Sequence, residues 1–106
     1  MQKSLTVLLD ALKRYHPQKI ILFGSAARGQ TDDESDLDLL VIKETREPFV
    51  ERLESMADLC PSGVHADILV YTPEEIQLML DDENPFIMQA LREGKILYEA
   101  NPAKKA

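Results

Sequence analysis

The sequence lacks the features of disulfide-stabilised, secreted and membrane-spanning proteins. Its only cysteine is Cys60, so no disulfide can form within the chain. It has no run of about 18 apolar residues, so no membrane-spanning helix is predicted. Near the start, Asp10, Lys13 and Arg14 interrupt the apolar segment that a signal peptide needs. We therefore expect a cytoplasmic protein.

Basic residues are also scarce. Lys and Arg number 12 against 19 Asp and Glu, which gives a net charge of −7. This balance argues against direct nucleic-acid binding through phosphate contacts. It fits a protein whose acidic residues hold cations, or one that binds a basic partner.

The chain is long enough for one modest core, since 44% of its 106 residues are hydrophobic. We predict one domain over residues 1–100 and a flexible tail over residues 101–106. Apolar periodicity and turn signals predict the following elements: helices over 2–15, 47–60, 73–81 and 84–94, and strands over 19–23, 36–43, 64–71 and 95–99. This order predicts an α/β (α+β) fold with a small mixed sheet packed by helices.

The helix predicted over residues 47–60 has an apolar periodicity that suggests which side is buried. The expected buried face consists of Val50, Leu53, Ala57 and Cys60. Cys60 follows other apolar residues, so a packing role is favoured over a reactive one.

Three acidic residues lie within predicted strands. Asp36 and Asp38 are two residues apart, so their side chains point to the same side of the sheet. Asp67 lies between apolar residues of the strand over 64–71, where a charged side chain needs a partner. If the two strands are neighbours, the three carboxylates meet and can hold two Mg²⁺ ions about 3.5–4 Å apart.

A small and basic segment follows the strand over 19–23. Gly24 allows the backbone to approach a ligand closely, and Ser25 can cap a short helix whose N–H groups bind phosphate. Arg28 can add a cationic contact to phosphate. The segment thus predicts a phosphate-binding turn beside the three carboxylates.

The motifs GSAARG, SDLDLLV and HADILVY together resemble the nucleotidyltransferase signature of the DNA polymerase beta superfamily. The small size resembles its minimal nucleotidyltransferase (MNT) subgroup. The resemblance implies that Gly24 and Ser25 bind the phosphates of ATP. It also implies that Asp36, Asp38 and Asp67 hold Mg²⁺ and carry the catalysis.

The same resemblance implies a partner and a biological role. MNT proteins often pair with a small helical HEPN ribonuclease toxin, which some of them silence by adding AMP to a tyrosine. We therefore expect an antitoxin that transfers NMP to a hydroxyl of a partner protein. The expected group is AMP, taken from ATP.

Other interpretations remain open at this stage. The protein could bind a toxin without catalysis, or modify a small molecule such as an antibiotic in a pocket completed by a partner. The segment DDESDLDLL could be a calcium loop, although it lacks the glycine and glutamate of that motif. Asp67 could be a core acid paired with a basic group, and Arg28 a solvated loop residue.

Overall fold

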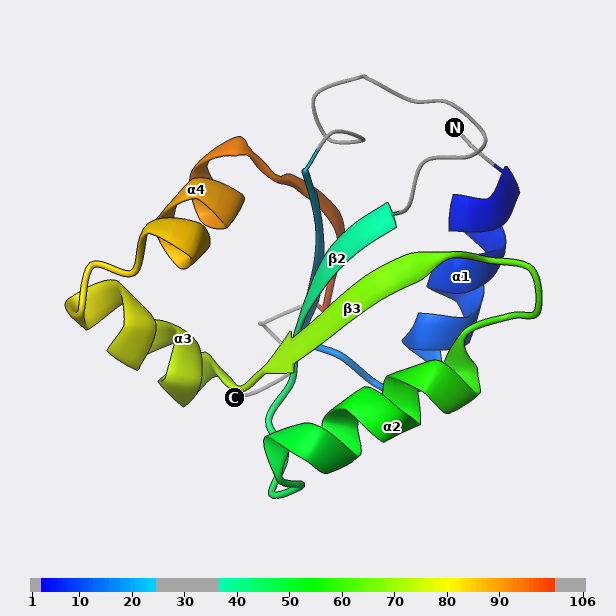
Figure 1. The fold of residues 1–106 in the computed structure, drawn as a ribbon, viewed down its shortest axis with the longest axis horizontal. Helices are drawn as coiled ribbons and strands as arrows, with labels where there is room; N and C mark the ends of the chain where they lie inside the picture. Colours follow the sequence, from blue (N-terminus) through cyan, green and yellow to red (C-terminus); the bar gives the residue numbers. More distant parts are fainter. Residues whose placement is uncertain (1–2, 25–36, 101–106) are drawn as a thin grey trace.

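The computed structural model describes residues 3–24 and 37–100. In these residues four helices and four strands form one mixed sheet flanked by helices (Figure 1). The helices are α1 (Lys3–Lys13), α2 (Phe49–Leu59), α3 (Pro73–Asp81) and α4 (Pro85–Glu93), and the strands are β1 (Lys19–Phe23), β2 (Leu37–Ile42), β3 (Ala66–Tyr71) and β4 (Lys95–Glu99). The α/β fold class predicted from the sequence is confirmed.

The strand order in the sheet is β3-β2-β1-β4. β1 pairs antiparallel with β2 and with β4, whereas β2 pairs parallel with β3. The crossover between the parallel strands is made by α2, as a parallel connection requires. β3 is therefore an edge strand of the sheet.

Each predicted element is present within a few residues of its expected bounds. Helix α3 begins with the expected capping box: the Thr72 hydroxyl accepts from the Glu75 N–H at 3.1 Å, and the Glu75 carboxylate accepts from the Thr72 N–H at 2.8 Å. Helix α4 begins with Asn84, whose side chain accepts from two backbone N–H groups. In both helices proline occupies the first turn, where its missing N–H costs nothing.

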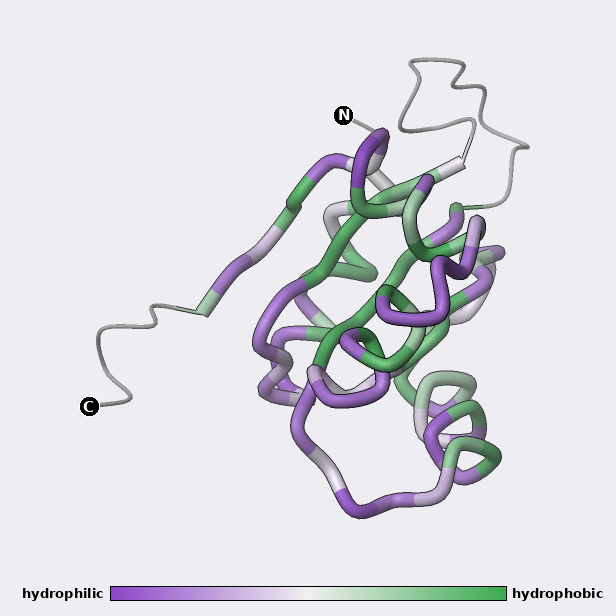
Figure 2. Tube along the Cα trace, turned by 90° about the vertical axis from the view of Figure 1, so that its left-hand side faces the viewer, coloured by the Kyte–Doolittle hydropathy of each residue, from purple (hydrophilic) through white to green (hydrophobic). Residues whose placement is uncertain are grey.

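The sheet has an apolar layer on each face. Helices α1 and α2 cover one face, and α3 and α4 cover the other (Figure 1). Hydrophobic residues concentrate along the central strands, and hydrophilic residues lie on the outer turns (Figure 2). The layer beneath α3 and α4 contains Ile21, Leu40, Ile76, Ile87 and Ala90.

The face that α2 buries differs from the predicted one. The helix buries Arg52 and Met56, whereas Val50 is 65% exposed and Leu53 is 39% exposed. The expected packing role of Cys60 holds only in part, since it is half-buried with its Sγ 3.4 Å from the Val64 carbonyl. The helix is turned because the Arg52 side chain enters the interior.

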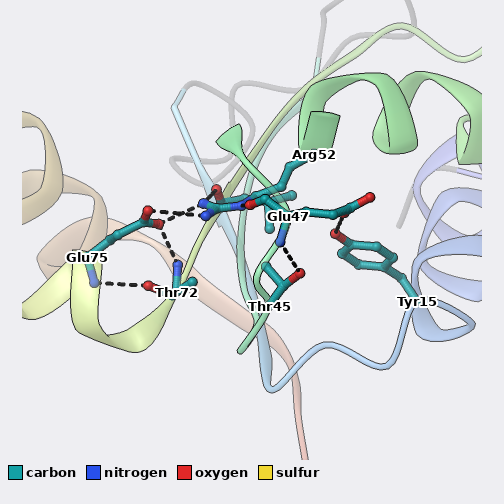
Figure 3. Close-up of polar contacts among 7 residues, drawn as sticks. Tyr15, Thr45, Glu47, Arg52, Thr72 and Glu75 are labelled. Carbon is teal, nitrogen blue, oxygen red and sulfur yellow. Dashed lines mark hydrogen bonds and ion pairs between the residues drawn. The ribbon is translucent and has the colours of Figure 1, made fainter. Parts of the chain in front are cut away.

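Arg52 binds the end of β3 and the start of α3 (Figure 3). Its guanidinium donates to both carboxylate oxygens of Glu75, at 2.7 and 3.2 Å, and to the Val70 carbonyl at 3.2 Å. Its Nε donates to the Glu47 carbonyl at 2.8 Å. The Glu47 carboxylate in turn accepts from the Tyr15 hydroxyl at 3.2 Å. Arg52 thus links α2 to β3, the strand that carries one predicted site residue.

None of the helices in the described part of the chain has the length and apolar character of a membrane span.

Candidate functional site

Asp38 and Asp67 are brought together by the sheet. They are register partners in the parallel pairing of β2 and β3, and neighbouring strands lie about 4.8 Å apart. Leu40 and Leu69, two residues further along each strand, pack in the layer beneath α3 and α4. Because side chains alternate between faces, both carboxylates lie on this same face.

Phe23 extends this row onto a third strand. It is the register partner of Asp38 in the antiparallel pairing of β1 and β2. Phe23, Asp38 and Asp67 therefore form one row across three strands, which we call the site row. The row lies where β1 ends and where β2 and β3 begin.

Gly24 follows the site row directly and packs on it. Its φ is +77°, a backbone conformation that residues other than glycine rarely adopt. A Cβ atom there would lie 2.4 Å from Oδ2 of Asp38. Only glycine therefore allows the turn to pass so close to the Asp38 carboxylate.

A cavity of about 500 Å³ opens beside the site row. Its lining comes from both sides of the edge strand β3: the two carboxylates and Phe86 lie on the face of α3 and α4, and apolar side chains of α2 lie on the other. A smaller cavity of about 160 Å³ lies on the other side of Phe23 and Phe86 and is lined by Gly24. The site row thus borders a space large enough for a small ligand, with charge at one side and apolar walls at the other.

Three of the predicted site residues lie outside the described residues: Ser25, Arg28 and Asp36. Their roles in binding phosphate and metal stay predictions. The predicted roles of Gly24, Asp38 and Asp67 are likewise not tested by the fold, although the strand adjacency on which they depended is present.

The sequence matches one protein family over most of its length. Residues 7–103 match the model of the family described as Polymerase beta, Nucleotidyltransferase. The chain belongs to this family. Because the match spans nearly the whole chain, the site row lies inside the matched nucleotidyltransferase domain, and the protein is a transferase of this class.

Individual proteins similar to this chain have names or folds of the same family. A protein of Methanocaldococcus jannaschii named "Putative protein adenylyltransferase" is 32% identical to this chain, in an alignment that covers 92% of this chain and 97% of the relative. A chain in a crystal structure of a toxin–antitoxin with AMP-PNP has a TM-score of 0.61 at 17% identity, covering 98% of this chain and 79% of that one. A chain described as a "putative nucleotidyltransferase" from Sulfolobus solfataricus has a TM-score of 0.53 at 13% identity, with 93% and 89% covered. These two structures share the nucleotidyltransferase fold.

Two carboxylates of the site row are candidate ligands for a hard cation. Within residues 3–24 and 37–100 no group of three or more His, Cys, Asp and Glu side chains could hold a metal ion. Asp38 and Asp67 supply two carboxylates at paired positions, which suits Mg²⁺ in its preference for oxygen ligands. The third predicted ligand, Asp36, lies outside the described residues.

Two aromatic residues of the site were not identified from the sequence. The sequence pattern predicted only that Phe23 lies in a strand and Phe86 in a helix. Their rings pack edge to face, with centroids 5.3 Å apart and an interplanar angle of 81°. The position of Phe23 directly before Gly24 was an available signal, but the approach of Phe86 to β1 depends on how α4 packs.

Proposed function

We propose that the protein transfers AMP from ATP to a hydroxyl group on a partner protein. The observation that carries the proposal is the paired position of Asp38 and Asp67 beside the close approach of Gly24. The name of the M. jannaschii relative, a protein adenylyltransferase, supports the acceptor class. The likeness to a toxin–antitoxin chain solved with AMP-PNP supports ATP as the donor and a toxin as the partner. We take this toxin to be a small helical protein of the HEPN type, and the chain to be its antitoxin.

The electrostatics of the site call for a cation. The triphosphate is anionic, two of the described site residues are carboxylates, and the whole chain carries −7. In the proposal Asp38 and Asp67, together with Asp36, hold Mg²⁺, which supplies positive charge to the phosphate oxygens. Gly24 leaves room for the phosphates against the backbone, and Ser25 and Arg28 donate hydrogen bonds to them.

The reaction is a single in-line displacement. The acceptor oxygen forms a bond to the α-phosphorus, the bond from that phosphorus to the bridging oxygen breaks, and pyrophosphate leaves with the bonding electrons. The acceptor loses its proton to a carboxylate of the site, for which Asp67 is the exposed candidate. The products are an AMP-modified hydroxyl and pyrophosphate.

The test is label transfer. The protein is incubated with Mg²⁺, a small all-helical protein encoded by a neighbouring gene, and ATP labelled on either the α- or the γ-phosphate. We expect α-label, and no γ-label, to become attached to the partner.

The matched variants are Asp38→Asn and Asp10→Asn. Both remove one acidic charge, but Asp10 is an exposed residue of α1 outside both cavities. Asp38→Asn should abolish transfer, and Asp10→Asn should keep it. A wild-type protein that binds and silences the partner without attaching label would contradict the proposal and indicate inhibition by occlusion.

A further inference from the structure

Phe86 is held in a fixed but open position at the start of α4. The Asn84 side chain accepts from the backbone N–H of Phe86 at 2.9 Å and from that of Ile87 at 3.3 Å. Ile87 is fully buried beneath the helix, whereas Phe86 remains 39% exposed. The cap and the buried neighbour therefore fix the backbone while leaving the ring partly in solvent.

The ring of Phe86 faces the site row. It packs edge to face against Phe23, the member of the row next to Asp38. An edge-to-face pair occupies at most one face of each ring, so aromatic surface stays available. The 500 Å³ cavity is lined by Phe86 and Phe23 together with Asp38, Asp67 and Leu69. One space thus joins the two carboxylates to an exposed aromatic wall.

We infer that Phe86 is the wall on which the base of the bound nucleoside triphosphate stacks. The inference rests on the proposed function, because it takes the triphosphate to lie at Gly24 and the two acids. A nucleotide held there by its phosphates extends its base into the adjoining cavity, whose walls beyond the acids are apolar and aromatic. A planar base covers such a ring well, as bases do in nucleic-acid-binding proteins.

The chemistry of this wall also sets a limit on selectivity. A phenylalanine ring donates and accepts no hydrogen bond, and every base has a π-face. Stacking on Phe86 should therefore strengthen the binding of ATP and GTP by similar factors. Discrimination between bases has to come from other groups.

The experiment compares ATP with inorganic triphosphate, each titrated with Mg²⁺ by calorimetry. Triphosphate has the phosphates but no base. Phe86→Ala should weaken ATP binding about 5- to 150-fold, the range for losing one base–aromatic stack, and leave triphosphate binding unchanged. Phe86→Tyr keeps the ring and should keep ATP affinity.

Met88→Ala is the matched control. Met88 lies on the same helix, is also 39% exposed, and lines neither cavity beside the site row. It should leave both affinities unchanged. ATP affinity that survives in Phe86→Ala would overturn the base-stacking inference while leaving the proposed function intact, as would an equal loss for ATP and triphosphate. A wild-type protein that binds neither ligand would overturn the proposed function itself, and the inference with it.

Discussion

Asp38 and Asp67 occupy paired positions of the parallel β2–β3 ladder and project from the same face of the sheet. Like charges at such positions repel and destabilise a sheet. In the proposed function, a cation bound between the two carboxylates offsets this repulsion. If the proposed site is correct, binding of a cation there must therefore stabilise the folded protein.

Gly24→Ala should damage both the fold and the site. The added Cβ would lie 2.4 Å from the Asp38 carboxylate, and alanine at φ +77° costs about 1–2 kcal/mol in backbone strain. We expect a lower melting temperature and a loss of Mg²⁺–ATP binding, measured by calorimetry.

Gly63→Ala separates these two effects. Gly63 has a similar φ of +84°, but a Cβ there meets no atom within 4 Å. It should lower the melting temperature by backbone strain alone and keep nucleotide binding. Equal nucleotide affinity in the two variants would show that the contact between Gly24 and Asp38 has no role in the site.

Arg52→Leu should destabilise the protein by about 2–4 kcal/mol, because the Val70 and Glu47 carbonyls lose their hydrogen bonds from Arg52 and the Glu75 carboxylate loses its ion-pair partner. Urea denaturation measures this change. Val50→Ala on the same helix serves as the control, since Val50 is 65% exposed and should change stability far less. Similar losses in the two variants would mean that Arg52 does not hold α2 on β3.

The ionisation of Glu75 should contribute to the pH dependence of the free energy of unfolding. The hydrogen bond from Arg52 holds the pKa of the Glu75 carboxyl below its ordinary value of 4.5. The unfolded chain therefore takes up this proton at higher pH than the folded one. The stabilisation is complete above pH 4.5 and is lost as the pH falls through the lower folded pKa.

Glu75→Gln removes this titration. The difference in unfolding free energy between the wild type and Glu75→Gln, measured from pH 7 down to about pH 3, should shrink at the acid end. A difference that is constant over this range would rule out the ion pair as its source.

The elements were predictable because their signals are local. Thr72 and Glu75 form a capping box with the proline between them, and Asn84 precedes a second proline, so both helix starts follow from a few adjacent residues. The apolar runs around Asp38 and Asp67 likewise predicted that both residues lie on strands. Their direct pairing could not be predicted, because it depends on the parallel register that the α2 crossover sets.

The errors and omissions have tertiary causes. The predicted buried face of α2 was wrong because the helix buries Arg52, which pairs with Glu75, 23 residues away, while Val50 and Leu53 stay exposed. Phe86 was missed because only the packing of α4 brings its ring to Phe23. Both depend on contacts between elements, which periodicity within one element does not contain.

The most direct test of the proposed site is the thermal melting of the wild type and Asp67→Asn, each with and without Mg²⁺ and AMP-PNP. At about 100 times the dissociation constant, the ligand should stabilise the wild type by about 2.7 kcal/mol, a shift of roughly 10–20 °C. Asp67→Asn should melt slightly higher than the wild type without ligand, because the repulsion from Asp38 is relieved, and should gain much less from Mg²⁺ and AMP-PNP. An equal ligand-induced shift in the two proteins would contradict the account, since Asp67 would then take no part in binding the metal–nucleotide complex.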